Sequence, residues 1–299
     1  MTPFRANLIL LLSMLSWAAA PPAAGYLIGP VPPLPLTFAR IGIATAVLLP
    51  LWLWREGAGA LTRAPWARAL GIGAIGLGAC GVLLVMAQAE TDAVTVAVIS
   101  ATAPVIGMAL ECLLDGRPVT LPLIGGIALS VTGGLLSLGS GIGGLEIGLG
   151  MVYAFSSVLL YTIGSRLTIT ALPGMSPLGR TTLPLIGALA ATGLCTAMLT
   201  SAGGPAVNWP AIGPREVLAL CIYGIFGMAI SQLTWIAGVG HLGIGTATLH
   251  MNAAPFYVMV FLFLLGDPWN WVQVAGAALV AAGVLLAQTG TARRAPVTE

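Results

Sequence analysis

One stretch of this sequence carries several polar side chains at helical spacing. Thr246, His250 and Tyr257 fall along one face of a helix, with Asn252 near the other side. Pro255 has no backbone N–H and therefore frees a carbonyl oxygen in the same stretch. Hydroxyl, imidazole and amide groups placed in this way indicate hydrogen bonding to a small polar molecule. A lone histidine in such a setting can instead be satisfied within the fold, and both interpretations stay open.

Trp17 is a second candidate for contact with a bound molecule. It lies midway along an apolar stretch, whereas most other tryptophans lie near the ends of such stretches, where they are typical interface anchors. Ser13 and Ser16 share its helix face. Trp17 either packs in the core with its N–H on a neighbouring carbonyl or forms the wall of a cavity.

Arg40 is the one charge that falls clearly inside an apolar stretch. Its burial requires a partner or water, and its planar guanidinium could receive a carboxylate through two parallel hydrogen bonds. Alternatively, it holds a helix end or a gate against carbonyls and lipid head groups. Arg180, its counterpart in the second half of the chain, lies near the cytoplasmic side, and such a symmetric pair favours this second role.

Other polar residues at comparable depth complete a candidate chamber, because unpaired polar groups are costly at that depth. The predicted binding residues are Ser16, Trp17, Gln88, Ser100, Tyr153, Ser157, Gln232, His250, Asn252 and Tyr257, with Arg40 as a possible gate or carboxylate contact.

No metal, cofactor or catalytic centre is predicted. The four cysteines are dispersed one per apolar stretch without metal-like spacing. The longer connections, near 55–68 and 200–215, contain no converging acid and base residues, so a membrane-embedded enzyme is only a remote alternative. The net charge of +2 comes without a basic run that could follow phosphates, which excludes nucleic acid as a partner.

The elements that must position these residues are membrane-spanning helices. Hydrophobic residues make up 58% of the chain, charged residues 7%, and the mean hydropathy is +1.01. Too few polar side chains exist to cover a soluble globule, and backbone groups in lipid must be satisfied by helices. Stretches of about 20 apolar residues predict ten spans. They lie near 7–27, 35–54, 69–89, 92–113, 119–138, 147–166, 178–199, 216–237, 244–265 and 269–288.

The arginines orient this bundle. With a cytoplasmic N-terminus, nine arginines fall on the inner side and only Arg215 on the outer side, a strong positive-inside signal. The inner set is Arg5, Arg55, Arg63, Arg68, Arg117, Arg166, Arg180, Arg293 and Arg294. Both termini are therefore expected in the cytoplasm, with the protein in the inner membrane.

The second half of the chain repeats the first. An offset of 151 pairs Thr95 with Thr246 and the dipeptide at 103–104 with that at 254–255, and an offset of 150 pairs Gly126 with Gly276. Five spans per half is an odd number, so the halves must enter the membrane from opposite sides. This predicts two inverted-topology repeats around a site near the midplane, and alternating access follows from the symmetry.

These features together resemble the drug/metabolite transporter superfamily, EamA branch. The resemblance rests on the five-plus-five arrangement, Trp17, Arg40 and the Ala-Pro pairs of the fourth and ninth spans. It implies a bundle of ten helices in which the third, fourth, eighth and ninth, assisted by the first and sixth, surround a central cavity. Relatives include amino-acid exporters and carriers of sugars, nucleotide derivatives, amines or vitamins.

We therefore expect an all-α integral membrane transporter. Residues 1–142 form the first repeat, 143–290 the second and 291–299 a cytoplasmic tail. It is expected to export small polar metabolites, with amino acids as the first expectation; amines, drugs, vitamins and nucleotide-type metabolites are alternatives. The partners are a small-molecule substrate and membrane lipid, in a monomer or homodimer. Since no carboxylate lies at mid-depth and only His250 could titrate there near neutrality, facilitated diffusion or weakly coupled exchange is expected.

Overall fold

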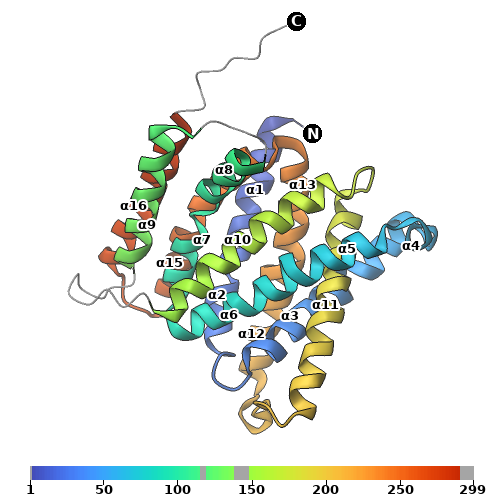
Figure 1. The fold of residues 1–299 in the computed structure, drawn as a ribbon. Helices are drawn as coiled ribbons and strands as arrows, with labels where there is room; N and C mark the ends of the chain where they lie inside the picture. Colours follow the sequence, from blue (N-terminus) through green and yellow to red (C-terminus); the bar gives the residue numbers. More distant parts are fainter. Residues whose placement is uncertain (1, 115–118, 138–147, 290–299) are drawn as a thin grey trace, which may run out of the picture.

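The computed structural model describes residues 2–114, 119–137 and 148–289, and every regular element in those ranges is helical (Figure 1). The all-helical fold is confirmed, whereas the expected tail at 291–299 and the expected boundary at 142 lie outside the described residues. The α-helices are α1 (Pro3–Ala18), α2 (Ala20–Gly25), α3 (Pro33–Glu56), α4 (Gly59–Arg63), α5 (Trp66–Gly73), α6 (Cys80–Glu90), α7 (Ala93–Ser100), α8 (Ala103–Leu114), α9 (Leu121–Ser137), α10 (Leu149–Thr170), α11 (Pro177–Ser201), α12 (Pro214–Gly224), α13 (Ser231–Leu242), α14 (Ile244–Ala247), α15 (Ala254–Leu264) and α16 (Trp271–Thr289). Two π-helical segments, η1 (Ala74–Ala79) and η3 (Ile225–Ile230), and two 3₁₀ segments, η2 (Trp209–Ala211) and η4 (Thr248–Ala253), complete the fold.

Seven helical segments are long and apolar enough to cross a membrane within the described ranges. They are Phe4–Gly25, Pro33–Glu56, Trp66–Glu90, Ala93–Leu114, Leu149–Thr170, Pro177–Ser201 and Pro214–Leu242. Three shorter apolar segments, Leu121–Gly134, Thr248–Leu264 and Trp271–Ala287, lie where the fifth, ninth and tenth spans are predicted. The count of ten spans and the orientation of the termini remain predictions.

Two of the long segments contain a π-helical turn in the middle. The segment η1 joins α5 to α6, and η3 joins α12 to α13. A π-turn adds one residue to a helix, changes the face that later residues present, and is often found at functional sites. Helical periodicity of apolar residues does not reveal such a turn.

Two other segments are interrupted near a proline. The helix is interrupted between α7 and α8, and α8 begins at Ala103, just before Pro104. In the other segment, α15 begins at Ala254, just before Pro255. Proline suits the first turn of a helix because its missing N–H has no partner there in any case. The start of α7 is fixed separately, because Oδ1 of Asp92 accepts hydrogen bonds from the N–H groups of Val94 and Thr95, both at 2.9 Å.

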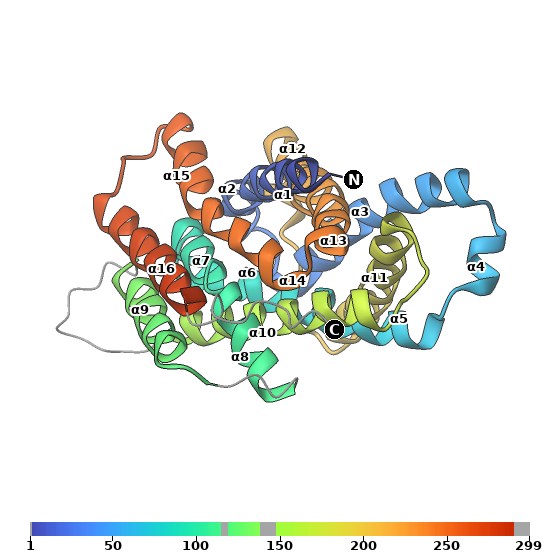
Figure 2. The same cartoon turned by 90° about the horizontal axis from the view of Figure 1, so that it is seen from above.

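Glycines let α9 and α16 pack closely along one edge of the bundle, where both views show them side by side (Figures 1 and 2). A Cβ atom on Gly126 would lie 2.5 Å from the carbonyl oxygen of Gly283, and one on Gly133 would lie 2.6 Å from that of Gly276. Small residues of this kind allow backbone contact where lipid gives no hydrophobic driving force between helices.

The remaining helices pair across the middle of the bundle. Helix α1 packs against α13 and α15, α10 against α6, α3 against α11, and α7 against α15. The largest apolar clusters lie where these pairs meet, with Trp235 and Ile99 among their fully buried side chains. The polar side chains that line a cavity between these helices define the candidate site.

Candidate functional site

A small cavity of about 60 Å³ lies at the centre of the bundle. Elements from both parts of the chain line it: α1, α3, η1, α6 and α7 before residue 142, and α10, η3, α13, η4 and α15 after it. Its lining consists of Met14, Trp17, Arg40, Leu77, Cys80, Leu84, Ser100, Ser157, Val158, Tyr161, Gly227, Met228, Ser231, Gln232, Met251 and Ala254. Both π-helical segments contribute to this wall.

The cavity brings together five of the predicted site residues: Trp17, Arg40, Ser100, Ser157 and Gln232. The Ser157 hydroxyl donates to the carbonyl of Cys80 at 2.9 Å, which links α10 to α6. The Gln232 amide oxygen accepts from the Tyr161 hydroxyl at 3.1 Å, which links α13 to α10. Ser100 donates to Val96 within its own helix at 2.8 Å. These bonds hold polar side chains at the cavity wall, where they can exchange protein partners for a bound molecule.

Arg40 is the charged group of the cavity. Its side chain is only 5% exposed, and Nη1 donates to the Tyr223 hydroxyl at 2.6 Å. The guanidinium carbon lies 4.7 Å from the centroid of the Tyr223 ring, within cation–π range. Its Nε is buried without a hydrogen-bond partner, and no aspartate or glutamate occurs among the described residues that line the cavity.

The other predicted site residues lie outside this lining. The Ser16 hydroxyl donates to the carbonyl of Phe226 at 2.7 Å, and Nδ1 of His250 lies 3.2 Å from the carbonyl oxygen of Ala247 in the preceding turn. Tyr153 and Tyr257 pack against buried apolar clusters, and Asn252 keeps a buried amide oxygen without a partner. A role for these residues in binding stays a prediction.

Sequence reasoning missed Tyr161 and Cys80, which also line the cavity. Tyr161 comes one helical turn after Ser157, so the spacing from a predicted residue could have indicated it. Cys80 follows η1 directly, and the extra residue of the π-turn sets the face on which it lies. No sequence signal indicates that face.

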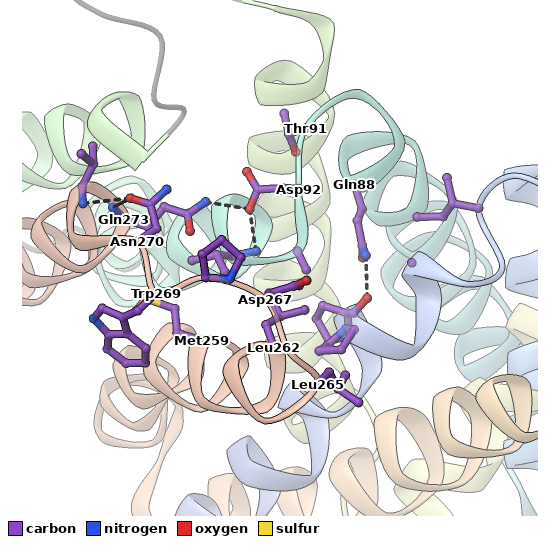
Figure 3. Close-up of a pocket in the computed structure, with 18 of the residues that line it drawn as sticks. Gln88, Thr91, Asp92, Met259, Leu262, Leu265, Asp267, Trp269, Asn270 and Gln273 are labelled. Carbon is purple, nitrogen blue, oxygen red and sulfur yellow. Dashed lines mark hydrogen bonds between the residues drawn. The ribbon is translucent and has the colours of Figure 1, made fainter. Parts of the chain in front are cut away.

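A second, larger pocket of about 780 Å³ opens at one end of the bundle, where α2 and α6 end and α7 and α16 begin (Figure 3). Gln88, predicted for the central chamber, lies here and donates through Nε2 to the Pro21 carbonyl at 2.6 Å. Gln273 donates to Asp92 at 2.9 Å on the opposite wall. We call this pocket the vestibule.

Some of the same helices line both the vestibule and the cavity. On α6, Leu84 lines the cavity and Gln88, one turn later, lines the vestibule. On α15, Ala254 lines the cavity and Met259 the vestibule. The hydrogen bond between Gln88 and Pro21 joins α6 to α2 at the wall of the vestibule. In the predicted orientation, the vestibule faces outward.

An all-helical bundle with several long apolar segments defines a polytopic membrane protein. A sequence profile described as "EamA-like transporter family" matches residues 4–139 and again residues 148–289. The chain belongs to this family of multi-pass membrane transporters, and the resemblance stated above is confirmed.

Two transporters of Bacillus subtilis (strain 168) are similar over most of their lengths. "Uncharacterized transporter YyaM" is 27% identical over 270 residues, covering 88% of this chain and 87% of YyaM. "Uncharacterized transporter YrdR" is 25% identical, covering 95% of this chain and 91% of YrdR. A "Probable terminal-alkyne amino-acid exporter" of Streptantibioticus cattleyicolor is 34% identical over only 88 residues, 29% of each chain.

A solved structure described only as "Crystal structure of protein" has the same fold. Its TM-score is 0.71 at 22% sequence identity, and the match covers 98% of this chain and 99% of that one. At this identity the likeness supports the fold alone.

Proposed function

We propose that this protein exports small polar metabolites, amino acids first among them, across the inner membrane by alternating access. The central cavity is the observation that carries the proposal, because its wall comes from both parts of the chain. A shift of one part against the other would then open it first toward one side and then toward the other.

Corresponding irregularities in the two parts of the chain support the inverted-repeat architecture. The π-helical segments begin at Ala74 and Ile225, and helices α8 and α15 begin at Ala103 and Ala254; both pairs are 151 residues apart. The family profile also matches the chain twice. Equivalent breaks at equivalent depth are expected of two units that exchange conformations.

The size of the cavity indicates that the cavity must widen when a substrate enters it. A cavity of about 150 Å³ can hold a benzene ring, and a space of about 60 Å³, well under half of that, has room for water but not for most amino acids. The vestibule is large enough for such a molecule. We infer that the substrate enters the centre only when the helices between the two spaces separate.

Amino acids are favoured over the other cargo classes by two observations. The polar groups of the cavity suit a molecule with both charges or none, because no carboxylate in the described lining could balance a simple cation. The amino-acid exporter from Streptantibioticus cattleyicolor adds support from a short match. Amines, drugs, vitamins and nucleotide-type metabolites remain the alternative cargoes, and a membrane-embedded enzyme remains the remote one.

Flux of labelled amino acids into proteoliposomes tests this proposal. We expect saturable flux of at least one amino acid, lowered about tenfold by Trp17→Ala, since about 1.4 kcal/mol of lost aromatic contact corresponds to that factor. Trp54→Ala is the control, because Trp54 is 76% exposed and lies away from the cavity. Equal flux in liposomes without protein for every amino acid would exclude this cargo class.

The same liposomes with an imposed pH gradient test the energy source. For facilitated diffusion or weakly coupled exchange we expect net flux to follow the substrate gradient, with little response to the proton gradient. Strong proton-driven accumulation that His250→Ala abolishes would contradict this mechanism.

A further inference from the structure

The side chain of Arg40 is a buried charge whose hydrogen-bonding capacity the protein leaves partly unused. It is 95% buried, since its exposed fraction is 5%, and it lines the central cavity. One bond goes to the neutral Tyr223 hydroxyl at 2.6 Å, while the buried Nε has no partner. A guanidinium is expensive to bury unless an anion and further hydrogen bonds compensate it.

The fold makes room for this side chain at one position. A Cβ atom on Gly81 would lie 2.8 Å from Nη2 of Arg40 and 2.9 Å from Cγ2 of Thr37. Only a hydrogen atom at this position of α6 therefore lets the guanidinium keep its place. The site is thus shaped around the charged head and not merely around the aliphatic stem.

The corresponding residue of the second half behaves differently. Nε of Arg180 donates to the backbone carbonyl of Leu172 at 2.9 Å, and its side chain is half-buried. This contact joins the start of α11 to the connection between α10 and α11. Such a contact is the structural role that the sequence favours for both arginines. The equivalent nitrogen of Arg40 makes no such bond, so the contact of Arg40 with Tyr223 is structural but leaves part of the guanidinium unpartnered.

We propose that Arg40 anchors the carboxylate of the transported molecule, so that substrates are carboxylate-bearing and the corresponding amines are rejected. This inference rests on the proposed transport function and names the substrate class of its cavity. A carboxylate offers the planar pair of acceptors that a guanidinium fork matches, and its charge balances the buried cation. Ser157 and Gln232 share the lining and would contact the polar remainder of the substrate.

Binding by the purified full-length wild-type protein gives the first test. Thermal shift and calorimetry are measured with L-amino acids and simple monocarboxylates, with the amide of each compound that binds and, for each amino acid that binds, with the amine formed by its decarboxylation. We expect binding of acids and at least about 30-fold weaker binding of the amides, in which an uncharged group replaces the carboxylate, and of the amines, as is typical when a buried charge loses its partner. This comparison needs no variant.

Variants then test whether Arg40 causes the preference for acids over amides and amines. Arg40→Gln is expected to weaken binding of the acid at least about 30-fold and to bring it to the level of the amide. Arg40→Lys is expected to weaken binding of the acid less, because lysine keeps the positive charge but lacks the planar pair of donors. Gly81→Ala retains the charge but displaces the guanidinium, so it should lower acid binding as well. Arg180→Gln is the matched control and should leave the preference for acids unchanged.

The outcomes separate this inference from the transport proposal. Equal binding of acids and amides, or an acid preference that Arg40→Gln leaves intact, overturns the anchor. If no carboxylate binds the wild type but amines are moved into liposomes, the anchor is wrong while the protein is still a transporter. If no compound of any class is moved while the acid preference depends on Arg40, the anchor holds and the transport proposal fails.

Discussion

Ser157→Trp is expected to reduce transport to the level of protein-free liposomes. Ser157 is 2% exposed and lines a cavity of about 60 Å³ at the contact between α10 and α6. An indole ring is larger than benzene, which is bound by a cavity of about 150 Å³, so it would fill the space that the substrate must enter. Uptake of the labelled substrate into proteoliposomes measures the effect.

Leu159→Trp is the control for this variant. Leu159 lies two residues away on the same helix and is 40% exposed on the outer surface of the bundle, so a larger side chain there meets no cavity. Overpacking of a core costs about 1–3 kcal/mol, and thermal melting must show that Ser157→Trp remains folded. Wild-type flux through a folded Ser157→Trp protein would mean that the substrate does not pass through this cavity.

Gly73→Ala is expected to prevent correct packing of α5 against α11. A Cβ atom at Gly73 would lie 1.8 Å from the carbonyl oxygen of Pro184, and the overlapping atoms belong to the backbone, so no side-chain rotation relieves the contact. The helices would have to separate, at a cost above the ordinary 1–3 kcal/mol or so of overpacking. We expect loss of the monodisperse folded species in size-exclusion chromatography in detergent.

Gly71→Ala provides the comparison within the same helix. No atom lies within 4 Å of a Cβ built on Gly71. Alanine favours a helix over glycine by up to about 1 kcal/mol, so this variant should be as stable as the wild type or slightly more stable. If both variants melt at the wild-type temperature, then α5 and α11 do not have the close contact described above.

The sequence predicts the membrane helices well because their signal is strong. A run of apolar residues is long, and its interruption by turns or charges marks its ends, so most predicted spans coincide with helical segments of the structure. Within two of the spans, at 92–113 and 244–265, the sequence predicts a continuous helix, whereas α8 and α15 begin anew at the Ala-Pro pairs, because proline is accepted in the first turn of a helix.

The candidate site is predicted less completely. Trp17, Ser100 and Ser157 were recognised from type and depth, but depth does not fix the direction of a side chain around the helix axis. The turn at η1 rotates all later residues of its segment, which places Cys80 at the cavity. His250 lies outside the lining on a 3₁₀ turn, whose periodicity differs from that assumed for a continuous α-helix.

Sided chemical labelling of Cys80 tests alternating access most directly. Cys80 lines the cavity and is 6% exposed; Cys112, Cys195 and Cys221 are replaced so that it is the single thiol. A charged, membrane-impermeant thiol reagent is applied to one side of oriented vesicles at a time. We predict reaction from either side, slowed by bound substrate. Reaction from one side only, at a rate that substrate does not change, would contradict a cavity that opens alternately to both sides of the membrane.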